Sequence, residues 1–176
     1  KRDVKEGTVF YSEGNSTDKI VLKKGFYVRD LTDGTSERFD TSGQLVYLYD
    51  KNQNYLKLDY TKKILTSMTT SSGKRVSLQY TPNGKVKEIR GPNGISTEYK
   101  YEKLNDLVFA KNVKNEETRY EYDSLHNMIK VVYADKTSKT LKYNQDKDWV
   151  TELVDRNKCV EKYEYTLSKE DPKNHY

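Results

Sequence analysis

The chain has 176 residues, of which 34% are hydrophobic and 34% charged, with a formal net charge of +5. The hydrophobic fraction lies below the roughly 45–50% of average globular domains, yet 16 Tyr, 4 Phe and 1 Trp exclude ordinary disorder, because disordered chains are poor in aromatic residues. The basic residues are dispersed along the chain, which argues against a nucleic-acid interface. The sequence contains no run of about 18 apolar residues, so no membrane span is predicted. The composition favours a sheet that encloses little volume.

Residues 1–32 contain three segments with the composition of strands, TVFYS, KIVLK and FYVRDL, separated by EGNSTD and KG. They lie outside the repeat that follows, so we expect a β-rich lead-in or cap over the first edge of the array, since terminal repeats need a different outer face. The first residues lack the apolar core of a signal peptide. We therefore expect the targeting signal of an excised segment to lie outside this sequence.

Residues 33–166 repeat with a period of about 21, because an aromatic residue closes each apolar-alternating segment and successive ones lie 21, 20, 21, 21, 21 and 22 apart. These marker aromatics are Phe39, Tyr60, Tyr80, Tyr101, Tyr122, Tyr143 and Tyr165. Another large residue stands two positions before each marker, except that Glu37 precedes the first. Alternation with a period of two predicts a half-buried strand that ends at each marker.

A second apolar pair follows each of the first six markers, with its members three residues apart. The pairs are Leu45 and Leu48, Leu65 and Met68, Val86 and Ile89, Leu107 and Ala110, Met128 and Val131, and Val150 and Leu153. Residues on one face of a flat strand lie two apart, so this spacing predicts a bulge or strong local twist in the returning strand. The predicted fold is all-β: consecutive antiparallel β-hairpins of about 21 residues in a twisted open sheet, which repeated bulges would coil into a spiral.

Gly or Asn occurs in many of the turns within and between the hairpins, and both residues tolerate the positive φ of tight antiparallel turns. They are Gly43, Gly84, Asn105 and Asn127 within hairpins, and Gly34, Gly73, Gly94, Asn115 and Asn157 between hairpins. No helix is predicted in residues 33–166. Residues 167–176 are predicted to be a polar tail or a truncated next repeat.

The segments RFDTSGQLVYLYDKN, LQYTPNGKVKEIRGPNG and TRYEYDSLHNMIKVVYADKTS resemble the YD repeat of RHS proteins, teneurins and wall-associated and insecticidal toxin scaffolds, whose repeats run YxYDxxGRLxxV before a DxxG turn. The resemblance covers residues 33–166, although the Asp after the marker is kept only at Asp40 and Asp123. It implies a strip of hairpins that spirals into a hollow shell, which in several members encloses a toxic polypeptide. The hairpins of this chain are too few to close a shell, so the expected partner is the remainder of a longer chain or a polypeptide cargo.

No group of residues has the spacing of a catalytic, metal or cofactor site, and none is predicted. Cys159 is the single cysteine, which excludes an internal disulfide, and with His126 and His175 it lacks zinc-ligand spacing. The redox state of Cys159 is left open. The segments GPNG at 91–94 and TPNG at 81–84 are predicted to be turns, because phosphate-binding loops need a helix N-terminus behind them.

The leading hypothesis is a non-enzymatic scaffold: part of a YD/RHS-repeat β-shell, or of a secreted or cell-surface adhesive protein, without a cofactor. The alternative is a carbohydrate- or cell-surface-binding module that uses exposed aromatics at Tyr99, Tyr120, Trp149 and Tyr163. We favour a structural role for the tyrosines, which would pack across neighbouring hairpins at roughly 0.2–1 kcal/mol per pair. Trp149, the residue type best suited to stacking on a sugar, occurs once and not in each repeat, which counts against the carbohydrate module. An uncovered sheet edge would lead to self-association.

Overall fold

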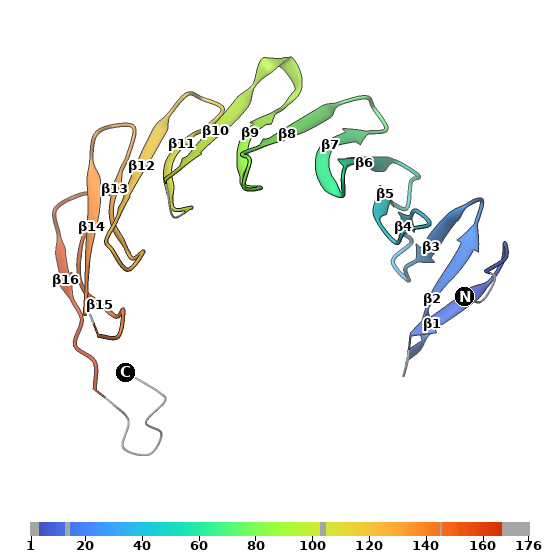
Figure 1. Cartoon of the computed structure of the whole chain (residues 1–176), viewed down its shortest axis with the longest axis horizontal. Coiled ribbons are helices and arrows are strands. Elements are labelled where there is room, and N and C mark those ends of the chain that lie inside the picture. The colour runs from blue at the N-terminus through green and yellow to red at the C-terminus, as the bar shows by residue number, and fades with distance from the viewer. Residues whose placement is uncertain (1–3, 13–14, 103–104, 145, 167–176) are drawn as a thin grey trace. The chain divides into compact units, whose positions relative to one another are not determined.

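The computed structural model describes residues 4–12, 15–102, 105–144 and 146–166. These residues form 16 strands of one open antiparallel sheet, in which the strand order follows the chain (Figure 1). The predicted all-β fold class is therefore confirmed. The strands are β1 (Val9–Ser12), β2 (Asn15–Lys23), β3 (Phe26–Asp30), β4 (Ser36–Phe39), β5 (Leu45–Tyr49), β6 (Tyr55–Thr61), β7 (Ile64–Thr70), β8 (Arg75–Tyr80), β9 (Val86–Arg90), β10 (Ser96–Tyr101), β11 (Leu107–Lys111), β12 (Glu117–Tyr122), β13 (Met128–Val132), β14 (Ser138–Tyr143), β15 (Val150–Val154) and β16 (Val160–Lys162).

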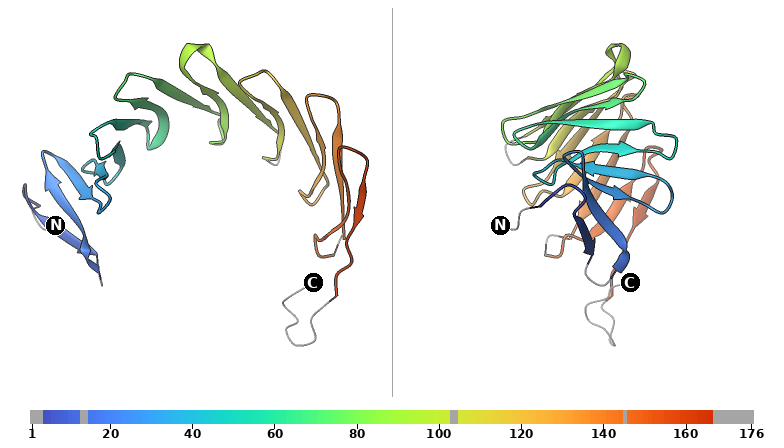
Figure 2. Two further views of the ribbon diagram at one scale, coloured as in Figure 1. Left: turned by 180° about the vertical axis from the view of Figure 1, so that it is seen from behind. Right: turned by 90° about the vertical axis from the view of Figure 1, so that its right-hand side faces the viewer.

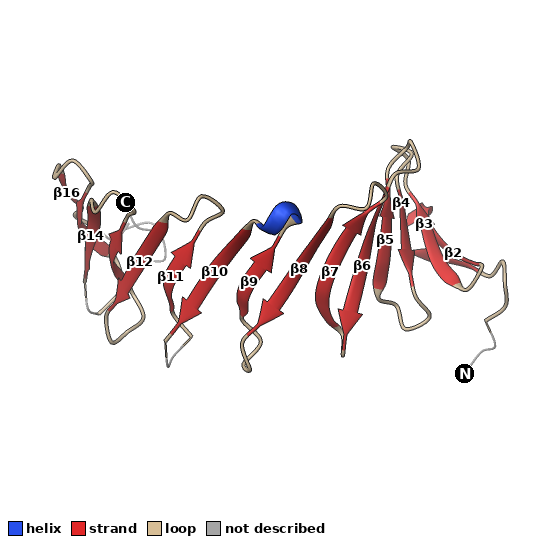
Figure 3. Ribbon diagram, turned by 90° about the horizontal axis from the view of Figure 1, so that it is seen from above, coloured by secondary structure: helices blue, strands red, loops and turns tan. Residues whose placement is uncertain are grey.

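The one helical element in the described part of the chain is a 3-10 turn, η1 (Pro92–Gly94), drawn in blue in Figure 3. It contains the PNG segment that was predicted to turn the chain between hairpins. Within the described ranges there is no helix of the length and hydrophobicity that a membrane crossing needs.

The chain divides into two compact units, one made of Lys1–Thr81 and Ile89–Ile95 and the other of Pro82–Glu88 and Ser96–Tyr176. Within each unit the chain runs up one strand and down the next (Figure 2). The predicted boundary at residue 32 stays a prediction, although Tyr27 of β3 pairs with Phe39 of β4 across it. The predicted tail, residues 167–176, lies outside the described residues.

A β-bulge lies beside the marker in five hairpins, which confirms the predicted irregularity and explains the spacing of three. In the hairpin of β10 and β11, Tyr101 pairs with Leu107 while Lys100 pairs with Phe109, so Val108 is the extra residue. The same register shift occurs at Phe39, Tyr60, Tyr122 and Tyr143. Because the extra residue lies between the two members of each apolar pair, both members face the same side as the marker.

The last marker departs from the prediction, because β16 ends at Lys162 and Tyr165 lies beyond it without strand structure. The shortened strand leaves Tyr163 tied to the sheet by its backbone N–H, which donates to the carbonyl of Thr151 at 2.9 Å.

An Asp or Asn side chain closes many of the turns. Asp40 Oδ1 accepts from the backbone N–H of Ser42 at 2.8 Å and of Gln44 at 3.0 Å, and Asp123 Oδ1 does the same at Leu125 and Asn127. The positive φ in two predicted turns falls one residue away from the expected Asn: at His126 (67°) instead of Asn127, and at Lys158 (69°) instead of Asn157. The side-chain bond from the first turn residue therefore sets the geometry, whatever residue occupies the strained position.

Little of the sheet is covered. Among the described residues the hydrophobic side chains classed as buried are Val28, Phe109 and Val131. Most strand residues are half-buried on both faces. Such a single layer gains its cohesion from contacts between neighbouring strands, as the composition had indicated.

Candidate functional site

The marker tyrosines form the most regular polar feature of the sheet. Each of four hydroxyls donates to a backbone carbonyl fifteen residues earlier in the chain: Tyr80 to Leu65 at 2.6 Å, Tyr101 to Val86 at 3.0 Å, Tyr122 to Leu107 at 3.0 Å and Tyr143 to Met128 at 2.9 Å. Every acceptor is the first member of the apolar pair in the preceding hairpin. The hydroxyl of one hairpin is thus bonded to the hairpin before it.

The bulge explains why that carbonyl is available. The ladder between β11 and β12 contains Phe109, Ala110 and Lys111, so Leu107 takes no part in it. A bulge leaves a backbone group without its ladder partner, and a half-buried carbonyl needs a donor. The phenol of Tyr122, from the next hairpin, supplies one. Sequence alternation located the tyrosines but gave no sign of this bond.

Burial raises the pKa of the hydroxyl groups of Tyr60, Tyr101, Tyr122 and Tyr143 above the usual value for tyrosine. The nearby Asp106 carboxylate raises the pKa of Tyr122 further. A phenol with a raised pKa stays protonated at neutral pH and can donate its hydrogen bond. These hydroxyls are therefore suited to structural donation, and none has the lowered pKa of an activated nucleophile.

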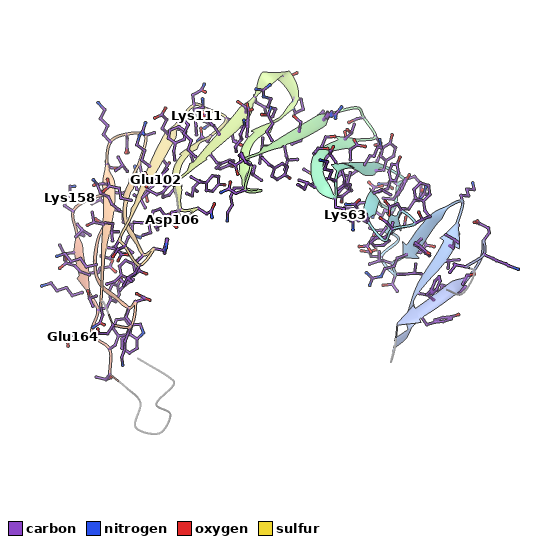
Figure 4. All side chains as sticks on the ribbon, in the orientation of Figure 1. Lys63, Glu102, Asp106, Lys111, Lys158 and Glu164 are labelled. Carbon is purple, nitrogen blue, oxygen red and sulfur yellow. The ribbon has the colours of Figure 1, made fainter. Side chains whose placement is uncertain are left out.

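The turns of successive hairpins also contact one another. His126 Nδ1 lies 2.8 Å from Asp106 Oδ2, and Asn127 Nδ2 donates to Asp148 Oδ1 at 2.9 Å. Figure 4 labels Asp106 and Glu102, which lie in the turn between β10 and β11. At the other end of the hairpins, Arg156 Nε donates to Thr137 Oγ1 at 2.8 Å. His126 thus joins two neighbouring turns.

The aromatics predicted as an alternative binding surface lie in two groups. Tyr99 and Tyr120 are half-buried on the marker face, by which we mean the face that carries the marker aromatics, and they pair across strands with Ala110 and Val131. Trp149 and Tyr163 lie near the C-terminal end of the described residues, where Trp149 contacts Tyr165 at 4.9 Å between ring centroids. The structure does not bring these two groups together into one site.

The other side of the sheet, called here the opposite face, carries cross-strand ion pairs. Lys130 pairs with Glu121 and Lys142 with Glu152, each at 2.8 Å. Phe109 is buried there beneath Lys100 and Arg119, whose charged groups lie 4.7 and 5.2 Å from its ring centroid. The residue types alone suggested charges that face solvent. The strand register instead places Lys100 and Arg119 over the Phe109 ring.

A polar network crosses three strands of the opposite face. Ser67 of β7 has 0% exposure, donates to Asp59 of β6 at 3.0 Å and accepts from Arg75 of β8 at 2.9 Å. Lys57 lies 2.7 Å from the other oxygen of Asp59, and its hydrogen bond is the main cause that lowers the pKa of that carboxyl. Because Ser67 has no exposed surface and none of the described residues beside it is a histidine, the network holds strands together and Ser67 is not an accessible nucleophile.

The opposite face also holds an aromatic cluster that the sequence analysis missed, made of Phe26, Tyr47, Tyr49 and Tyr55 with Arg38. The sequence did contain one indication of this cluster. Tyr47 and Tyr49 flank Leu48 in the strand after the first marker, so alternation places both tyrosines on the face opposite to Leu48. The grouping itself depends on the register of three strands. No set of three or more metal-ligating side chains occurs within the described ranges.

No protein-family model and no curated protein matches this chain. Among solved structures it is similar to a chain of the TcdB2–TccC3 complex and to one of the TcdB2–TccC3–Cdc42 complex, each with 19% identity over 73% of this chain and 7% of that chain, at a TM-score of 0.56. It is also similar to a chain of the Photorhabdus luminescens Tc holotoxin pore, with 16% identity over 76% of this chain and 9% of that chain, at a TM-score of 0.56. The chain therefore spans less than a tenth of the length of the chains it matches, and the likeness supports an RHS-like fold.

Proposed function

We propose that this chain is a non-enzymatic structural segment of a YD/RHS-repeat array, which forms part of the wall or adhesive surface of a larger secreted or cell-surface protein and needs no cofactor. One observation carries the proposal: the bond from marker hydroxyl to bulge carbonyl recurs at the same spacing of fifteen residues in four hairpins. A hydrogen bond repeated in this way stabilises an extended array, and each of these tyrosine hydroxyls is already bonded within the sheet.

The exposure of the sheet supports a covering partner for the marker face. Leu78, Leu141 and Leu153 are only half-buried there, and apolar surface of this kind gains free energy when another polypeptide covers it. The proposed partner is the remainder of a longer chain or a polypeptide cargo. A further part of the proposal is that the larger protein is associated with a toxin, which the similarity in fold to a chain of the Tc holotoxin pore supports.

The test compares the accessibility of the two faces in the longer polypeptide that carries this segment. In a Cys159→Ser background, single cysteines replace Thr118 on the marker face and Glu121 on the opposite face, and the rate of thiol labelling is measured. We expect both cysteines to react in the isolated chain, and the one at Thr118 to be protected in the longer polypeptide. Equal labelling rates on the two faces of that polypeptide, or a natural protein with no further sequence, would contradict the proposal.

A glycan array distinguishes the scaffold from a marker-face carbohydrate module. The scaffold predicts no glycan binding that depends on Tyr101 and Tyr122. Specific binding that is lost when both are replaced by Ala, in a variant with an unchanged circular dichroism spectrum, would favour the carbohydrate module.

A further inference from the structure

Three tyrosines form a compact platform on the opposite face of β5 and β6. The ring centroids of Tyr47, Tyr49 and Tyr55 lie 5.7 to 5.8 Å apart, and Phe26 approaches Tyr47 at 6.2 Å. Register produces the triangle, because Tyr49 pairs directly with Tyr55 while Tyr47 lies on the same side of the strand two residues earlier. Tyr55 is 37% exposed, so ring surface is open to solvent.

Arg38 lies against this platform, with its guanidinium carbon 4.1 Å from the centroid of the Tyr49 ring. The acids nearest to it in sequence have other partners: Glu37 pairs with Arg29 at 3.2 Å, and Asp40 closes its own turn. No hydrogen bond or ion pair joins the Arg38 side chain to any residue that the structure describes, and its Nε is buried without a partner. This always-charged group with five directional donors thus contacts the Tyr49 ring and has no acidic partner in the described part of the chain.

Two other arginines of the chain show what is unusual about Arg38. Arg119 lies over Phe109 and Arg156 over Tyr133, the latter at 4.3 Å. Both have an acidic partner: Arg119 pairs with Glu117 at 3.0 Å, and Arg156 pairs with Asp135. Among these three ring-supported arginines, Arg38 alone lacks an acid in the described part of the chain.

These observations define the ligand chemistry. The electron-rich face of a tyrosine attracts the polarised C–H groups of a pyranose ring, and a guanidinium binds a carboxylate through two parallel N–H···O bonds. We propose that Arg38 and the Tyr47, Tyr49 and Tyr55 platform bind a carboxylated sugar of the uronic or sialic acid type, with the carboxylate on Arg38 and the sugar ring on the tyrosines. The site lies on the opposite face from Tyr99 and Tyr120, and it does not depend on whether the marker face is covered.

The experiment titrates the whole chain with three probes: 3′-sialyllactose, a hyaluronan tetrasaccharide that carries glucuronic acid, and lactose as the neutral sugar. Isothermal titration calorimetry gives the affinity, and saturation-transfer NMR identifies the sugar protons in contact. We expect at least one acidic probe to bind and lactose not to bind at the same concentrations. The two acidic probes distinguish sialic from uronic acids.

Variants then assign the site. Arg38→Gln should weaken binding by about ten- to a hundred-fold, the worth of a charge-assisted bidentate contact. Arg156→Gln removes an arginine with the same kind of ring contact but with an acid partner, and should leave the affinity unchanged. Tyr55→Leu keeps apolar bulk and should weaken binding while the circular dichroism spectrum stays the same.

If Arg38→Gln does not fold, Arg38→Lys takes its place in the test. This variant keeps the positive charge but lacks the planar guanidinium that makes two parallel hydrogen bonds to a carboxylate, so it should also bind the acidic sugar more weakly. The proposal is wrong if neither acidic probe binds, if lactose binds equally well, or if Arg38→Gln and Arg156→Gln behave alike. Binding of a phosphotyrosine or sulfotyrosine peptide without binding of either acidic sugar would also overturn it.

Discussion

Replacing Tyr122 by Phe tests the bond that links neighbouring hairpins, because the change removes one hydroxyl and leaves the ring. The hydroxyl donates to the Leu107 carbonyl at 3.0 Å. A hydrogen bond of this kind contributes about 0.5–1.5 kcal/mol net, and a buried acceptor left unpaired costs about 1–3 kcal/mol. Since Leu107 is only half-buried, water can partly replace the phenol, and we expect a loss of about 1 kcal/mol in the free energy of unfolding.

The assay is urea unfolding followed by circular dichroism, with a thermal scan beside it, in which a loss of 1 kcal/mol corresponds to about 2–4 °C for a chain of this size. Tyr133→Phe is the matched control, because no hydrogen bond joins the Tyr133 hydroxyl to any residue in the described ranges. The double variant Tyr80→Phe with Tyr122→Phe should lose the sum of the two effects, since the two bonds belong to different hairpins and share no residue. If Tyr122→Phe unfolds at the same urea concentration as Tyr133→Phe, the bond contributes nothing and the reasoning fails.

Three further predictions concern turns, packing and pH. Gly43 has φ of 85° and Lys136 has φ of 66°, so Gly43→Ala should destabilise the chain by about 1–2 kcal/mol and Lys136→Gly should stabilise it by up to about 1 kcal/mol. A more stable Gly43→Ala variant or a less stable Lys136→Gly variant in urea unfolding would refute the turn assignment. Phe109→Ala should cost about 3 kcal/mol, near the lower end for a buried Phe because the sheet is a single layer, and a loss under 1 kcal/mol would show that Lys100 and Arg119 do not bury the ring. Hydrogen bonds from Ser42 and then from the Gln44 backbone lower the pKa of Asp40. The stability that this carboxylate adds should therefore be present above its unfolded pKa of about 4 and be lost as the pH falls through the folded value. When the free energy of unfolding is measured from pH 6 to pH 3, it should fall less for Asp40→Asn than for the natural chain.

The strand pattern and the turn positions could be predicted because both depend on neighbours along the chain. Alternation around Tyr101 and Tyr122 depends on the pleat of a single strand, and the DTSG segment at 40–43 closes its own turn. The spacing of three in the apolar pairs that follow the first six markers even indicated the bulge. The strand at Tyr165 could not be judged in this way, because a strand at the end of the described sheet has a neighbour on one side only.

The sequence by itself determined the all-β class, the period of the hairpins and the face on which the markers lie, since a pleated strand places alternate residues on opposite sides whatever surrounds it. Only the tertiary structure decided which group accepts each tyrosine hydroxyl, because a bulge must first release the carbonyl of the preceding hairpin. The same holds for the platform at Tyr47, Tyr49 and Tyr55 and for Arg38, which has no acidic partner among the residues that the structure describes. Those contacts join three strands whose register is set by turns and bulges, and a pattern read along one strand does not contain them.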